Sequence, residues 1–132
     1  GSYHYRVIAL NICKLGLTGT IPPQLGNLSF LVSLDMIWNN FQGELPYELT
    51  HLCRLQVLNL TANKLGGSIP SWVGSLQKLH YFSLKNNSFA SSIPPSISNM
   101  SNRIRHSISA FTTPHTPAIT TFAAAFGWST LI

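Results

Sequence analysis

The sequence predicts an α/β repeat solenoid in which short parallel strands form a sheet along one side of the molecule. Three observations support this prediction: apolar residues recur every 24 residues, each repeat contains an alternating apolar pattern, and proline recurs in the same register. A strand with one apolar face cannot bury that face alone, but the next repeat can cover it. We therefore expect about four stacked repeats.

Columns of apolar residues mark the period, which runs without a gap from Val7 to about Met100. The columns at strand positions are Leu10, Leu34, Leu58 and Phe82, and, two residues on, Ile12, Met36, Leu60 and Leu84. Later columns are Leu17, Phe41, Leu65 and Phe89, and then Pro22, Pro46, Pro70 and Pro94. We expect a repeat region over residues 1–101, with repeats near 5–27, 28–51, 52–75 and 76–99.

An asparagine column follows the predicted strands at Asn39, Asn63 and Asn87. Where the chain leaves a strand, backbone groups point inward without a ladder partner, and an amide side chain can both donate to them and accept from them. We expect these three residues to form a structural asparagine ladder. In the first repeat the same place holds Leu15, which suits an atypical terminal repeat.

The unit L-x-x-L-x-L-x-x-N-x-L resembles the leucine-rich repeat. One copy consists of Leu55, Leu58, Leu60, Asn63 and Leu65. The segment from Leu17 to Gly26 reads L-x-G-x-I-P-x-x-L-G and looks like the plant extracellular subtype. The resemblance covers roughly Tyr5 to Ser101 and implies an ectodomain fragment of a plant leucine-rich-repeat receptor-like kinase.

The resemblance also implies where such a protein acts. Members of that family carry a cytoplasmic Ser/Thr kinase, which this sequence lacks together with the transmembrane helix and a signal peptide. We expect a location on the extracellular side of the plasma membrane, or secretion. The stretch Pro117–Ile132 is uncharged but short and diluted by hydroxyl residues, so it is a poor membrane span.

The composition excludes several other functions. The net charge is +5, but only 8% of residues are charged and no basic stripe stands out, so nucleic acid is not an expected partner. The two cysteines, Cys13 and Cys53, are too few for a disulfide scaffold, and their different places in the repeat disfavour a mutual bridge. His51 and Cys53 fall short of the four ligands of a structural zinc site.

No catalytic chemistry is expected in this chain, and no cofactor or metal. The acidic residues are Asp35, Glu44 and Glu48. Glu44 and Glu48 allow a paired-carboxylate hydrolase as the least favoured hypothesis, but both lie in a repeat loop. Phosphate-binding, kinase and nucleophile-elbow motifs are missing from the sequence.

Residues that alternate with the buried strand positions should line the concave face, where solenoids usually bind their partners. The most contact-prone types among them predict a binding surface made of Asp35, Ile37, Trp38, Tyr81 and Lys85. The alternative is that Trp38 and Tyr81 lie flat over neighbouring repeats as packing.

Four N-glycosylation sequons begin at Asn27, Asn59, Asn86 and Asn99. The repeat itself favours Asn-Leu-Ser/Thr, so each has a structural explanation as well. With so little charge, they still suggest a secreted glycoprotein.

The period stops after Ser101, and residues 102–132 form a tail rich in Thr, Ser and Ala. We expect this tail to be disordered or to form a poor cap. A shifted reading frame, an aberrant exon or a natural truncation would each explain it.

The sequence therefore predicts a recognition module of a plant cell-surface receptor with a role in signalling or defence. Its expected partners are a protein or peptide ligand and a co-receptor ectodomain. One alternative is a secreted inhibitor of microbial cell-wall hydrolases of the polygalacturonase-inhibitor type. Another is a non-functional truncated receptor fragment.

Overall fold

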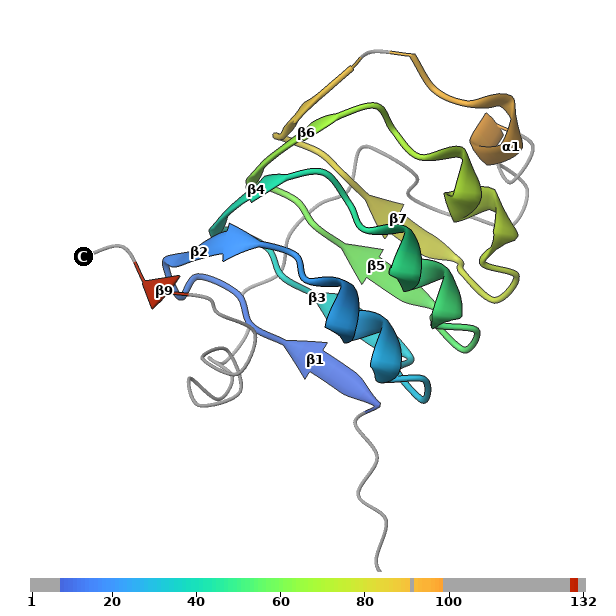
Figure 1. Ribbon diagram of the computed structural model, residues 1–132, viewed down its shortest axis with the longest axis horizontal. Helices are drawn as coiled ribbons and strands as arrows, with labels where there is room; N and C mark the ends of the chain where they lie inside the picture. Colours follow the sequence, from blue (N-terminus) through green and yellow to red (C-terminus); the bar gives the residue numbers. More distant parts are fainter. Residues whose placement is uncertain (1–7, 91, 99–128, 131–132) are drawn as a thin grey trace, which may run out of the picture.

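A computed structural model describes residues 8–90, 92–98 and 129–130 of the chain. The predicted contact residues and ladder residues all fall within these ranges. Asn99 and nearly all of the tail lie outside the described residues, so the boundary at residue 101 and the order of the tail stay predictions. Figure 1 shows the described part as successive turns that pass from a first sheet to a second sheet and then through a short helix.

The first sheet contains one strand from each repeat, in the order β1-β3-β5-β7. Its strands are β1 (Ala9–Asn11), β3 (Ser33–Asp35), β5 (Val57–Asn59) and β7 (Tyr81–Ser83). All neighbours are parallel, and the register pairs Leu10 with Leu34, Leu34 with Leu58, and Leu58 with Phe82. The predicted alignment of equivalent residues as adjacent steps of one parallel sheet is confirmed.

A second sheet, which the sequence analysis did not predict, runs along the opposite side of the core. Its strands are β2 (Leu17–Thr20), β4 (Asn40–Gly43), β6 (Lys64–Gly67), β8 (Ser88–Phe89) and β9 (Ser129–Thr130), in the order β8-β6-β4-β2-β9. The first four strands are parallel, and β9 adds to β2 in the antiparallel direction. The end of the tail thus pairs with the first repeat.

Short helices form the third side of each turn (Figure 1). They are the 3-10 helices η1 (Pro23–Asn27), η2 (Tyr47–His51) and η3 (Ser71–Ser75) and the α-helix α1 (Pro95–Ser98). Each 3-10 helix follows an extended proline, whose carbonyl accepts a hydrogen bond from the amide three residues later. Proline suits this place because its fixed φ is compatible with the entry and its missing N–H is not needed there.

The hydrophobic core lies between the two sheets and the helices. Leu34, Leu58 and Phe82 from the first sheet, and Phe41 and Leu65 from the second, have no exposed surface. The helices add Leu25, Leu49, Val73 and Ile97, which are at most 3% exposed. Because each repeat contributes one residue to every column, the core is continuous along the stack.

A column of left-handed backbone follows the first sheet. Lys14, Trp38, Ala62 and Asn86 have φ between 55° and 61°, although none is glycine. This conformation costs an L-residue about 1–2 kcal/mol, and asparagine tolerates it best. The repeat therefore imposes the same strained turn at four positions with four different side chains.

This strain predicts an unusual response to glycine. Ala62→Gly should raise the free energy of unfolding by up to about 1 kcal/mol, because relief of strain exceeds the entropy that glycine adds to the unfolded chain. The same change in a strand, Ala9→Gly, should lower it by about 0.5–1 kcal/mol. Urea unfolding of both variants measures the difference, and a loss of stability in Ala62→Gly would contradict the expectation.

Candidate functional site

The asparagine ladder fixes the end of each first-sheet strand against the neighbouring repeat. Asn39 Oδ1 accepts hydrogen bonds from the amides of Leu15 and Leu17, both at 3.1 Å. Its Nδ2 donates to the carbonyls of Ile12 at 2.7 Å and Met36 at 3.1 Å. One side chain therefore joins two repeats through donors and acceptors together.

Asn63 and Asn87 repeat this arrangement one and two units further on. Asn63 accepts from the Phe41 amide at 3.2 Å and donates to the Met36 carbonyl at 2.9 Å. Asn87 accepts from the Leu65 amide at 3.0 Å and donates to the Leu60 carbonyl at 2.8 Å. These bonds hold the strand ends, and with them the face that the strands present, in a fixed spacing.

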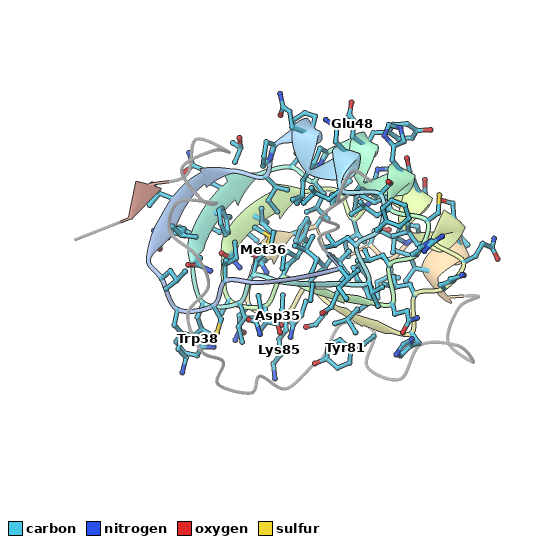
Figure 2. All side chains as sticks on the ribbon, turned by 90° about the horizontal axis from the view of Figure 1, so that it is seen from below. Asp35, Met36, Trp38, Glu48, Tyr81 and Lys85 are labelled. Carbon is cyan, nitrogen blue, oxygen red and sulfur yellow. The ribbon has the colours of Figure 1, made fainter. Side chains whose placement is uncertain are left out.

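The predicted contact residues differ in how much surface they offer. Trp38 is 53% exposed, Lys85 is exposed and Tyr81 is half-buried. Asp35 is only 7% exposed and Ile37 has no exposed surface. Figure 2 shows Asp35, Trp38, Tyr81 and Lys85 on one side of the molecule and Glu48 on the opposite side.

The burial of Ile37 corrects the expectation that it offers contact area. Its equivalents in neighbouring repeats, Cys13 and Thr61, are also nearly buried, at 1% and 2% exposure. Lys85, the fourth residue of this column, is exposed, so the burial does not extend along the whole column. Trp38, Tyr81 and Lys85 remain as the accessible members, and we call these three the strand-face surface.

Lys14 extends the strand-face surface beside Trp38. Its ammonium nitrogen lies 5.6 Å from the centroid of the Trp38 ring, within the range of a cation–π contact. Lys14 was not among the predicted contact residues. Its place one 24-residue period before Trp38 is the sequence signal that could have identified it.

A buried polar network lies between β5 and β7 on the same side of the sheet. Asn59 Oδ1 accepts a hydrogen bond from Thr61 Oγ1 at 2.7 Å, and that hydroxyl lies 2.6 Å from Ser83 Oγ. Asn59 is 5% exposed and Ser83 is fully buried. Buried hydroxyls that are satisfied in this way rigidify the sheet behind the strand-face surface.

Tyr81 is the residue of this surface with a perturbed acidity. Burial raises the pKa of its phenol above 10.0, and the negative charge of Asp35 raises that pKa further. The phenol therefore stays protonated at physiological pH and keeps its O–H as a hydrogen-bond donor.

The sequons separate by exposure. Asn27 and Asn86 are exposed, whereas Asn59 is buried and hydrogen-bonded to the Thr61 hydroxyl of its own sequon. A glycan attached to Asn59 would have to extend into solvent from a side chain that is almost completely buried.

When the chain is secreted from eukaryotic cells, we expect glycans on Asn27 and Asn86. We expect no glycan on Asn59 in the folded protein. Glycopeptide mass spectrometry of the secreted protein measures occupancy. Ser29→Ala and Ser88→Ala should each remove one glycan as controls. Full occupancy at Asn59 in folded protein would contradict this assignment.

Within the described ranges, residues 8–90, 92–98 and 129–130, no group of three His, Cys, Asp or Glu side chains could hold a metal ion. Cys13 is buried and Cys53 is exposed, and the two are not bridged. The same part of the chain contains no helix of the length and apolarity that a bilayer crossing requires.

Comparison with known proteins agrees with this geometry. The model of the Leucine Rich Repeat family matches residues 30–52, 54–76 and 78–100. A chain of the BIR3–SERK2 complex from Arabidopsis thaliana is 31% identical with a TM-score of 0.66, over 71% of this chain and 51% of that one. Comparison with curated protein sequences gives no match.

Two further similar solved structures also contain a pair of named components each. PEPR1–AtPEP1 is 41% identical with a TM-score of 0.66, over 68% of this chain and 13% of that one. The plant peptide hormone receptor RGFR1 in complex with RGF2 is 36% identical with a TM-score of 0.59, over 62% of this chain and 13% of that one. The chain therefore spans about half of the first of these three structures and a small part of the other two.

Proposed function

Because this chain belongs to the leucine-rich-repeat family, we propose that it is a recognition module of a plant cell-surface receptor kinase that binds a peptide or a co-receptor ectodomain through the strand-face surface. The observation that carries the proposal is that Trp38 and Lys85 are exposed, and Tyr81 is half-exposed, in or just beyond the strands of the first sheet, in a chain whose similar structures include a plant peptide hormone receptor in a complex. The module performs no chemistry itself, and it acts on the extracellular side of the membrane.

The chemistry of the strand-face surface suits a polypeptide partner. Trp38 supplies a large apolar area at low entropic cost, and aromatic residues are enriched among interface hot spots. Tyr81 offers a hydroxyl donor, while Lys14 and Lys85 offer positive charge. A partner with an apolar side chain and a nearby carboxylate would satisfy all of these groups.

The rigid support of the surface lowers the cost of binding. The asparagine ladder and the buried network of Asn59, Thr61 and Ser83 fix the strands before a partner arrives. A preorganised surface loses less conformational entropy on association than a flexible loop.

The test is binding of the full chain to the SERK2 ectodomain and to the AtPEP1 and RGF2 peptides, measured by biolayer interferometry. We expect binding to at least one of them, weakened about tenfold or more by Trp38→Ala, which corresponds to about 1.4 kcal/mol. Glu48→Ala, on the opposite side (Figure 2), should leave the affinity unchanged. Binding to none of the three, or binding that Trp38→Ala and Lys85→Ala leave unchanged, would refute the proposal.

A further inference from the structure

An open cavity of about 480 Å³, a surface depression and not an enclosed void, lies on the side of the solenoid formed by the second sheet and the short helices. Glu44 directly follows β4, Ser68 directly follows β6, and Ser71 and Trp72 open η3. These four residues line the cavity together with the apolar side chains of Leu45 and Ile69. Its volume is within the usual range of small-ligand sites, about 300–1,000 Å³.

The repeat architecture does not require these side chains. The positions equivalent to Trp72 hold Gln24, Glu48 and Ser96, and those equivalent to Glu44 hold Thr20, Ser68 and Ser92. Core columns stay apolar in every copy, whereas these two columns vary in type, and only Ser68 and Ser92 are alike within one column. An indole beside a carboxylate is therefore particular to the junction between the second and third repeats.

The position of Glu44 depends on a glycine in the next repeat. Gly67 has a φ of +82°, and a Cβ at this residue would lie 2.6 Å from Glu44 Oε1 and 2.8 Å from Glu44 Cγ. The carboxylate side chain thus lies across the Gly67 backbone in space that any other residue would fill. The missing Cβ at Gly67 therefore leaves room for the Glu44 side chain beside the cavity.

From this juxtaposition we infer that the cavity binds a neutral carbohydrate, in a function separate from the proposed recognition by the strand-face surface. The C–H groups on one face of a sugar ring are slightly positive and match the negative face of the Trp72 ring. The Glu44 carboxylate accepts hydrogen bonds from sugar hydroxyls, and Ser68 and Ser71 both donate and accept.

The charge of the site favours a neutral ligand over an ionic one. An anion would be repelled by the Glu44 carboxylate that lines the cavity. For a cation the described lining residues offer only the single carboxylate of Glu44, with no second acidic group among them. Hydroxyl groups carry no such penalty, and their hydrogen bonds to a charged acceptor are stronger than those to a neutral acceptor.

The experiment is calorimetric titration of the full chain with cellohexaose, chitohexaose and, as a cationic probe, a hexa-arginine peptide. We expect one of the neutral oligosaccharides to bind with little dependence on salt, and Glu44→Ala to weaken its binding about tenfold or more. Glu44 is exposed, so this variant should fold normally. Trp72→Leu should abolish binding, and Glu48→Ala and Trp38→Leu are the matched controls that should not change it.

Three results would overturn the inference: binding of neither oligosaccharide, binding that Glu44→Ala does not weaken, or salt-dependent binding of hexa-arginine in place of the sugars. Trp72 is partly buried against the core, so a melting curve must show that the Trp72→Leu variant is folded before its binding is interpreted. If that variant is unfolded, the binding measured for Glu44→Ala tests the inference instead. Loss of partner binding in Trp38→Ala with sugar binding intact separates this inference from the proposed function.

Discussion

Replacing Leu58 by alanine is expected to lower the free energy of unfolding by about 2–5 kcal/mol. Leu58 is fully buried, and its backbone pairs with Leu34 on one side and Phe82 on the other. The cavity left by the substitution would therefore lie in the middle of the stack and loosen two repeat interfaces. Because each repeat contacts only its neighbours, the rest of the molecule cannot compensate for the loss.

Val57→Ala is the matched control for this prediction. Val57 is the neighbouring residue in β5, but it is half-buried on the opposite side of the sheet. We expect it to cost less than about 1.5 kcal/mol, since it removes less buried apolar surface. Urea unfolding followed by circular dichroism measures both variants, and equal losses would show that the core does not lie where Leu58 points.

Replacing Asn63 by leucine should lower the free energy of unfolding by about 2–4 kcal/mol, because each buried polar group left without its partner costs about 1–3 kcal/mol. The substitution removes the side-chain acceptor of the Phe41 amide. It also removes one donor from the carbonyls of Met36 and Leu60, which keep donors from Asn39 and Asn87. The largest part of the lost stability should therefore come from the Phe41 amide in β4, which is left without an acceptor.

Asn40→Leu tests whether the loss in Asn63→Leu is specific to the ladder. Asn40 is a half-buried residue of β4 and does not belong to the asparagine column. Its substitution should change stability by no more than about 0.5 kcal/mol. Thermal and urea unfolding of the two variants compare them, and similar losses would mean that the ladder amide contributes nothing beyond its volume.

The sequence predicted the parts of the fold that repeat. Leu10, Leu34, Leu58 and Phe82 fall 24 residues apart, and one parallel register brings all four together. The same contact is made between each pair of neighbouring repeats, so selection for one residue type acts in every copy. The columns are visible in a single sequence for this reason.

The candidate site was less predictable, because the exposure of a strand residue depends on its neighbours in space. Trp38 and Ile37 are adjacent and were predicted to serve the same surface, yet one is 53% exposed and the other has no exposed surface. Likewise Asn59 carries the same sequon pattern as Asn27 but is buried within a hydrogen-bonded network. Residue type alone carried no signal that separates these pairs.

The sequence by itself determined the period, the first sheet and the buried columns, because these follow from local alternation repeated at a fixed interval. The tertiary structure alone decided the second sheet, where Asn40–Gly43 and Lys64–Gly67 are strands in spite of glycine and polar residues that seldom favour strands. The tertiary structure also decided the cavity beside Trp72. The second sheet and this cavity both form only when neighbouring repeats are stacked on each other.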